Sequence, residues 1–325
     1  MIKDAKKLIE EKIKVINKSP DDAFRLAKQA EKSVLNEILS EINKLEVKNG
    51  SIVMNRKNLL ILEDISDDIK KISENEDYLK VVKELVGGID SVKEINDKYF
   101  KEIFNVKPDA FAKKVLDNSR KYAVEAMIGA SMHEEFLKPI SGLINTSIQT
   151  GASINDLTKD IQEFVEGDGK VDGRLTSYSR QIALDSISIS DRAYTNAIAE
   201  NLDFEFYFYA GGLVEPTGYT KSGNPIGGTR CFCRVRDGEY FHWKEIEAWG
   251  NGDTGLSVDE DCGFPWGGMR DGTNGSTIFT YLGGYNCQHS LMPVSIFDTP
   301  KDVVERAIDL GYYNQSEKEL ELLEL

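Results

Sequence analysis

The residues best suited to chemistry lie in two short runs in the last third of the chain. Residues 229–234 have the sequence Thr-Arg-Cys-Phe-Cys-Arg, and residues 283–289 have the sequence Gly-Gly-Tyr-Asn-Cys-Gln-His. Together they hold three of the four cysteines and one of the three histidines of the 325-residue chain. Thiolate and imidazole groups bind soft metal ions, and a thiol beside an imidazole can act as a nucleophile. Any chemistry of this chain is expected here.

If these runs bind a metal, a Cys-x-Cys pair, a distant histidine and a Cys-x-His pair would supply the ligands. The four expected ligands, followed by two reserve cysteines, are Cys233, His242, Cys287, His289, Cys231 and Cys262. Such a set would hold a tetrahedral zinc ion and fasten a loop-rich region. Most structural zinc sites place about two to four residues between paired ligands, whereas a one-residue gap in a strand points both side chains the same way. The spacing therefore favours buried thiols and a hydrogen-bonded histidine over zinc.

Two further roles for the same residues stay open. A disulfide between Cys233 and Cys287 is the covalent alternative in an oxidising compartment. Cys233 could also be a nucleophile with His289 as its base, but no local oxyanion loop or orienting third residue is recognisable. Four cysteines in a chain of this length do not resemble a secreted disulfide framework. Metal binding or buried thiols are the better expectations.

Helical periodicity dominates the chain up to about residue 202. Ser19-Pro20 is typical of a helix start, and apolar residues then recur at three- and four-residue intervals as far as Gly50. Further amphipathic stretches lie near 55–73, 76–104, 108–137 and 154–166, and one more helix is predicted over 173–202. Pro108 and Pro139 interrupt the pattern. Helices of this kind usually bundle within one chain.

The period changes after residue 203. Residues 204–209, Phe-Glu-Phe-Tyr-Phe-Tyr, alternate with a two-residue period and predict a strand. Residues 211–284 are rich in turn-forming residues and predict loops around a short helix at 243–249. A last helix at about 300–310 precedes an acidic tail. The expected fold class is α+β: an extended, mostly helical N-terminal region followed by a small, loop-rich mixed α/β module.

The charge balance limits the partners. The chain has 40 Lys+Arg against 55 Asp+Glu, a formal net charge of -15. Binding to nucleic acid by counterion release needs a dense basic surface, so DNA contact is not expected to be the main interaction. No stretch approaches the roughly 18 uninterrupted apolar residues of a membrane span, and the first residues form no apolar signal-peptide core. A cytosolic product without a membrane anchor is expected.

The order of these features resembles the phage Mu F-type head-morphogenesis family, the minor capsid proteins of tailed bacteriophages. The resemblance covers about residues 150–297. It rests on a helix with Ser-Arg-Gln-Ile-Ala at 179–183, the aromatic strand ending in Ala-Gly-Gly at 210–212, both Cys/His runs, and Pro293-Val294. Segment 218–228 departs from the family as an insertion. Besides the cysteines and histidine, the motif residues are Thr229, Arg230, Phe232, Arg234, Gly283, Gly284, Tyr285 and Asn286.

The resemblance implies three regions: a helical, partner-binding region over 1–150, a Mu F-like head-morphogenesis domain over 151–300, and a terminal helix with an acidic tail over 301–325. It implies a minor structural protein of the phage head that associates with the portal or inner capsid during head assembly or genome delivery. Such a protein is assembled in the bacterial host cytoplasm and lies in the capsid interior or at the portal vertex.

The same resemblance implies no enzymatic activity, and structural zinc is the one cofactor considered. One alternative is a zinc-dependent hydrolase or nuclease with His242 or Glu245 near the metal. A second is a DNA-binding packaging factor, which the net charge disfavours.

Overall fold

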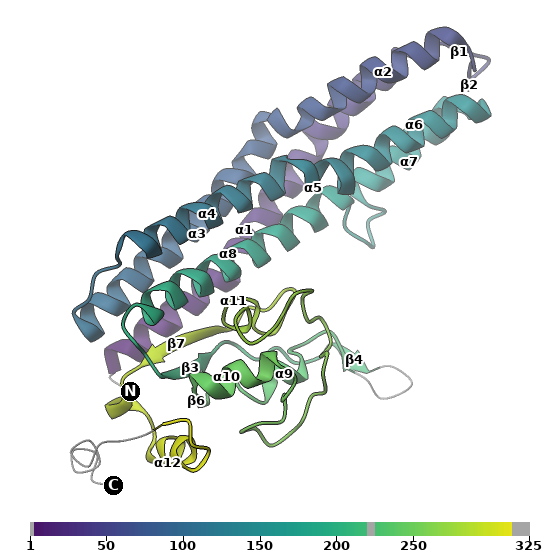
Figure 1. Cartoon of the computed structure of the whole chain (residues 1–325). Helices are drawn as coiled ribbons and strands as arrows, with labels where there is room; N and C mark the ends of the chain where they lie inside the picture. Colours follow the sequence, from purple (N-terminus) through teal and green to yellow (C-terminus); the bar gives the residue numbers. More distant parts are fainter. Residues whose placement is uncertain (1–2, 220–224, 314–325) are drawn as a thin grey trace. The chain divides into compact units, whose positions relative to one another are not determined.

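The computed structural model describes residues 3–219 and 225–313 (Figure 1). Residues 314–325, with the whole predicted acidic tail, lie outside the described residues, as do residues 220–224 of the predicted insertion. The described chain is mostly helical up to residue 200 and then forms a small mixed module with antiparallel sheets. The predicted α+β class is therefore confirmed. Within the described ranges, no helix has the length and apolar character needed to cross a bilayer.

Helices make up most of the first two hundred residues, and a short antiparallel pair, β1 (Val47–Lys48) and β2 (Ser51–Ile52), lies after the first of them. Most of the predicted stretches correspond to helices. Helix α6 was not predicted, because Pro139 interrupts the pattern; this proline lies in the first turn, where its missing N–H is tolerated. The helical elements are α1 (Lys3–Ile42), α2 (Arg56–Lys70), η1 (Lys71–Glu74), α3 (Glu76–Phe104), α4 (Ala110–Ile128), α5 (Ala130–Met132), the π-helical η2 (His133–Leu137), α6 (Lys138–Thr150), α7 (Ile154–Glu166) and α8 (Arg174–Glu200).

Helix α1 corrects the helix start predicted at Ser19-Pro20. It is one helix of 40 residues with Pro20 in its interior. A proline removes one backbone hydrogen bond and usually breaks a helix. Here the buried apolar positions continue at helical spacing on both sides, with Ile16 and Ala23 both fully buried. Burial of the same face before and after the proline therefore stabilises a continuous helix.

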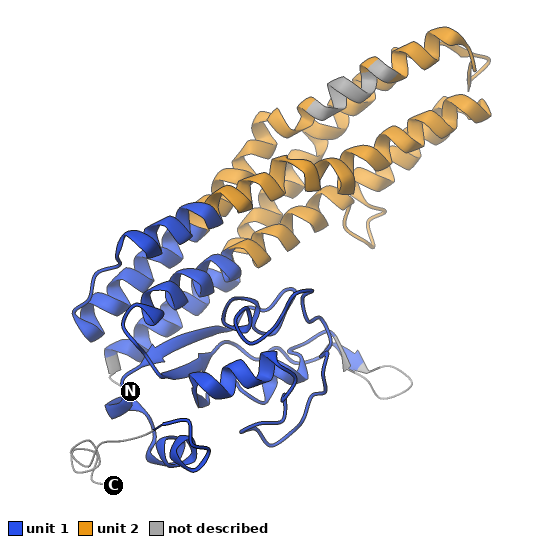
Figure 2. Cartoon of the chain, viewed as in Figure 1, with its two compact units in different colours: residues 1–17, 89–119, 187–325 blue, residues 18–88, 120–186 orange. Residues whose placement is uncertain are grey.

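The described chain divides into two compact units (Figure 2). Unit 1 comprises residues 1–17, 89–119 and 187–325, and unit 2 comprises residues 18–88 and 120–186. Helices α1, α3, α4 and α8 contribute residues to both units. Both Cys/His runs belong to unit 1.

Unit 2 has buried polar contacts between segments that are distant in the sequence. The hydroxyl of Tyr78 donates to the carbonyl of Met127 at 3.0 Å. Glu31, only 2 % exposed, accepts a hydrogen bond from Thr176 and forms an ion pair with Lys28 at 2.8 Å. Burial raises the pKa of the Glu31 carboxyl. These contacts join helical segments that are distant in the sequence, and satisfied buried polar contacts make the packing of such segments more specific.

In unit 1, the chain after α8 forms the mixed module. Strand β3 is central in an antiparallel sheet of order β6-β3-β7, and β4 pairs with β5 separately. The predicted alternation is present, since Phe206 and Tyr207 belong to two different hydrophobic cores. The elements are β3 (Phe206–Ala210), β4 (Gly218–Tyr219), β5 (Pro225–Ile226), α9 (Cys231–Arg234), β6 (Tyr240–His242), α10 (Trp243–Gly250), α11 (Ile278–Tyr281), β7 (Ser290–Val294), η3 (Ile296–Asp298) and α12 (Lys301–Asp309).

A buried polar cluster joins β7 to three helices of unit 1. The carboxylate of Asp191 on α8 forms an ion pair with Lys12 of α1 at 3.0 Å and accepts a hydrogen bond from Asn96 of α3 at 2.8 Å. It also accepts from the hydroxyl of Ser290, the first residue of β7. Burial lowers the pKa of the Lys12 ammonium, and Asp191 opposes that shift. A buried charge is tolerated when it is paired and hydrogen-bonded in this way.

Candidate metal centre

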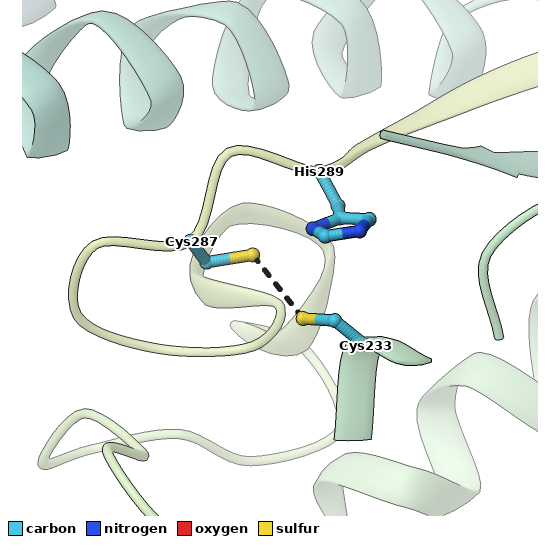
Figure 3. Close-up of side chains that lie close together, drawn as sticks. All are labelled: Cys233, Cys287 and His289. Carbon is cyan, nitrogen blue, oxygen red and sulfur yellow. Dashed lines mark hydrogen bonds between the residues drawn. The ribbon is translucent and has the colours of Figure 1, made fainter. Parts of the chain in front are cut away.

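The two runs meet inside unit 1 (Figure 3). The sulfurs of Cys233 and Cys287 lie 3.6 Å apart, and the ligand atoms of these cysteines and His289 all lie within 4.8 Å of one another. The three side chains are buried, with exposed fractions of 3 %, 4 % and 4 %. We call Cys233, Cys287 and His289 the Cys/His centre. Its composition and geometry mean that it could hold a metal ion.

The loop between α11 and β7 carries two of the three residues. Its turn is closed by hydrogen bonds from the N–H of Gly284 to Tyr281 at 2.8 Å and from the N–H of Cys287 to Gly284 at 3.2 Å. Gly284 and Asn286 both adopt left-handed backbone conformations, with φ of 92° and 58°. Glycine and asparagine are the residues that reach this region most readily. Gly284 and Asn286 thus allow the backbone turn that positions Cys287 and His289.

Arg192 of α8 fixes this loop through hydrogen bonds to its backbone. Its guanidinium donates to the carbonyls of Cys287 and His289, each at 3.0 Å, and to the carbonyl of Thr280 at 2.6 Å. The side chain is 2 % exposed. Arg192 is a site residue that the sequence pattern alone did not predict. A signal was present, because Asp191 and Arg192 are the only charged residues between positions 186 and 199.

Two glycines allow the backbone to approach the centre closely. A Cβ atom at Gly283 would lie 2.3 Å from the sulfur of Cys233 and 3.0 Å from that of Cys287. A Cβ atom at Gly211 would lie 2.0 Å from Cδ2 of His289. The shortest distance at each position, 2.3 Å at Gly283 and 2.0 Å at Gly211, is far below van der Waals contact, so neither position has space for a side chain. Gly283 of the second run is therefore required by space rather than by backbone conformation.

We expect Gly283→Ala to lower the free energy of unfolding by about 2–3 kcal/mol or more, since the added methyl group overpacks a closed core. The matched control is Gly142→Ala in α6, where an added Cβ would meet nothing within 4 Å. That control should melt at the same temperature or slightly higher, because alanine favours a helix by about 0.5–1 kcal/mol. Thermal melts of both variants test this expectation. Equal melting of Gly283→Ala and the parent chain would contradict the described geometry.

Electrostatics favour one shared proton between the two sulfurs. The hydrogen bond from Cys233 lowers the pKa of the Cys287 thiol, and His289 and Arg192 lower it further. The same hydrogen bond, together with burial, raises the pKa of the Cys233 thiol. The hydroxyl of Tyr209 also donates to the Cys233 sulfur at 3.2 Å. Cys287 is thus the preferred thiolate, and a bound cation would replace the proton between the sulfurs.

The geometry fits a tetrahedral thiolate-binding ion. Two thiolates each at about 2.3 Å from a tetrahedral zinc ion are separated by about 3.8 Å, close to the observed 3.6 Å. Both ring nitrogens of His289 are buried and have no hydrogen-bond partner among the described residues. Buried polar atoms normally have partners, and a metal ion would satisfy one of these nitrogens. The carboxylate of Asp237, 3.7 Å from Nε2 of His289, is positioned to orient the ring.

The two reserve ligands form a disulfide instead. Cys231 and Cys262 are bonded to each other, with their Cα atoms 5.7 Å apart. This corrects both the reserve assignment and the expectation against disulfides. Cys231 and Cys233 lie on the one-turn helix α9 rather than on a strand. Since residues two apart on a helix point about 200° apart, one cysteine faces the Cys/His centre and the other faces Cys262.

The structure does not bring His242 into the Cys/His centre. His242 is the N-cap of α10, where Nδ1 accepts a hydrogen bond from the N–H of Lys244 at 3.2 Å. Glu245 completes this capping box by accepting from the N–H of His242 at 2.6 Å, and it also accepts from Arg306 at 2.8 Å. Neither residue of the proposed hydrolase site therefore joins the group that could hold a metal. The local demand of a helix start explains both residues.

The cap position of His242 predicts a pH dependence of stability. Burial, followed by the charge of Lys244, lowers the pKa of His242 from 6.5 to about 4. Between pH 6.5 and about pH 4, His242 is therefore protonated in the unfolded chain and neutral in the folded chain. The stability contributed by neutral His242 is complete above pH 6.5 and is lost as the pH falls towards 4.

His242→Asn keeps a good N-cap acceptor and removes the titration. The fall in melting temperature between pH 7 and pH 5 should be smaller in this variant than in the parent chain. His133→Gln, a change at a histidine whose side chain is 43 % exposed, is the control and should follow the parent. Identical pH profiles of the His242 variant and the parent would rule out the assigned role.

Two motif residues of the first run pack directly beside the centre. The ring of Phe232 stacks on Trp266 with centroids 4.1 Å apart and 17° between the planes. The guanidinium of Arg230 donates to the carbonyl of Gly283 at 3.2 Å. The first run is thus joined to the second by a hydrogen bond as well as by the sulfurs.

The remaining motif residues stabilise the surrounding loops. Thr229 Oγ1 accepts from the N–H of Val214 at 2.7 Å and fastens the end of the predicted insertion. Arg234 forms an exposed ion pair with Glu260 at 3.1 Å. Tyr285 is 39 % exposed and does not contribute to the buried centre.

Comparisons with family models, curated proteins and solved structures found no match for this chain.

We expect the reduced protein to bind one Co²⁺ or Zn²⁺ ion per chain at the Cys/His centre. Co²⁺ should give thiolate charge-transfer absorption, and Cys287→Ser should weaken binding by roughly 100-fold, because one of the two thiolates is lost. The control is Cys231→Ser combined with Cys262→Ser, which removes the disulfide and leaves the centre intact. Titration followed by absorption and metal analysis measures both. Equal binding by the Cys287 variant and the control would remove this site from consideration.

Proposed function

We propose that this chain is a minor structural protein of a tailed-bacteriophage head, which associates with the portal or inner capsid during head assembly or genome delivery. The observation that carries the proposal is the convergence of the two motif runs. Cys233 and Cys287 are 54 positions apart in the sequence, yet their sulfurs lie 3.6 Å apart in a buried core. The motif that resembles the Mu F-type family thus corresponds to one fastening of the mixed module.

In this proposal the Cys/His centre holds structural zinc. Its three side chains are at most 4 % exposed, close glycines enclose them, and the Arg192 hydrogen bonds fix the loop that carries Cys287 and His289. Buried ligands on distant segments are typical of an ion that contributes to folding. A fastening role for the module suits a component that must survive assembly and packaging.

The partner-binding surface is proposed on the helical part. In unit 2, Met54, Leu59 and Leu60 lie close together in the sequence and are 66 %, 40 % and 51 % exposed. Clustered exposed apolar side chains are a common mark of a protein interaction surface. The net charge of -15 supports protein partners over DNA, since binding to phosphates needs a basic surface. The protein would then lie in the capsid interior or at the portal vertex.

Particles purified from the host that expresses this chain should contain it in low copy relative to the major capsid protein. A photo-cross-linking residue in place of Leu60 should give a covalent product with the portal, whereas the same residue in place of the exposed Val171 should give little.

Cys233→Ser should reduce incorporation of the chain into particles, since the mixed module loses one ligand of its Cys/His centre, and Cys262→Ser should reduce incorporation less. Mass spectrometry of particles measures all three. Absence of the chain from both procapsids and mature particles would refute the proposal.

A further inference from the structure

A pocket of about 580 Å³ lies in unit 1, away from the residues of the Cys/His centre. It is lined by the C-terminal end of α8, the turn that follows, β3, α10 and the segment before α11. Its volume is within the range of about 300–1,000 Å³ that is typical of small-molecule sites. The function proposed above does not use this pocket.

Aromatic rings form its apolar walls. Phe204, Trp243 and Phe279 are half-buried and pack on the core of the module, while the buried Tyr207 lies with its ring 5.8 Å from that of Phe279. Aromatic faces carry negative electrostatic potential and attract cations. A cation is already near one of these rings, since Lys244 Nζ lies 5.6 Å from the centroid of Trp243. The walls therefore suit an aliphatic stem with a positive charge.

Carboxylates surround the same space. Glu200, Asp203, Glu205 and Glu247 line the pocket, and no lysine or arginine is among its described lining residues. Glu200 is held by a hydrogen bond from Asn196, another lining residue, at 2.7 Å. Carboxylates from α8, the following turn and α10 thus line one pocket, which favours a positively charged ligand.

Tyr207 gives a further indication of a ligand. Its side chain is only 3 % exposed, yet it lines the pocket. Burial, followed by the charge of Glu200, raises the pKa of this phenol, so the hydroxyl stays protonated and neutral. The phenol oxygen is therefore available to accept a hydrogen bond from an N–H group in the pocket.

We propose that this pocket binds a small organic cation, an ammonium or guanidinium group on an aliphatic stem. The rings contact the stem and the charged group, the carboxylates neutralise the charge, and Tyr207 accepts a hydrogen bond from the nitrogen. A free alkyl polyamine and a basic side chain share this chemistry. The pocket is thus distinguished from a simple acidic surface by its aromatic walls and by the Tyr207 side chain of β3.

Isothermal titration of the full chain at fixed ionic strength tests the proposal, with spermidine and N-acetyl-arginine amide as probes. At least one probe should bind with a stoichiometry of one. The double variant Glu200→Gln and Glu247→Gln should weaken binding at least about 10-fold, because two neutralising charges are lost. Glu305→Gln, the same change at an exposed position of α12, is the matched control and should bind as the parent does.

The outcomes are decisive in either direction. Preference for spermidine assigns the pocket to free polyamines, and preference for the arginine amide assigns it to a presented side chain; both support the proposal. No binding of either probe at millimolar concentration overturns it, as does equal binding by the double variant and the control. Displacement by equimolar Mg²⁺ also overturns it, since the rings would then play no part. Circular dichroism melts, with the single variant Glu200→Gln as a milder change, show that lost binding does not reflect unfolding.

Discussion

The hydrogen bonds from Arg192 to the carbonyls of Cys287 and His289 are the contacts on which the mixed module depends most. A buried guanidinium has five donors in a fixed plane. Here it joins two elements, because the guanidinium donates to the loop at Cys287 and His289 and to Thr280 of α11. The preceding residue, Asp191, holds the start of β7 through Ser290. Two neighbouring residues of α8 therefore bind the end of this loop and the first residue of β7.

This arrangement explains why the Cys/His centre can be so tightly enclosed. Because hydrogen bonds from α8 fix the loop, the backbone of Gly283 can pack directly against the sulfurs of Cys233 and Cys287. Arg230 then joins the first run to the same glycine. The sulfurs, the glycine and the two arginines form one connected set, and the hydrogen bond between the two sulfurs is a consequence of their enforced proximity.

The sequence was sufficient for the fold class, the strand at 206–210 and the pairing of the two runs, because each depends on local periodicity or on motif residues with a single steric purpose. It was insufficient where a local choice had two solutions. The Cys-x-Cys run could be a strand or a helical turn, and the turn sends Cys231 to Cys262. Pro20 could begin a helix or interrupt one, and burial on both sides decided for a continuous α1. His242 carried the residue type of a ligand but occupies a helix cap.

Helix α9 places one bonded and one unbonded cysteine two positions apart. The two cysteines of the disulfide are 31 positions apart. In the chain-entropy view, this cross-link lowers the entropy of the unfolded chain and thereby stabilises the folded state by about 3–4 kcal/mol. The neighbouring thiol takes part in a centre that a cation could occupy. If an ion binds at the Cys/His centre, the same turn of helix is secured by two independent chemistries. A reducing agent then releases the segment that leads to Cys262, while a chelator acts only on the opposite side, towards Cys287.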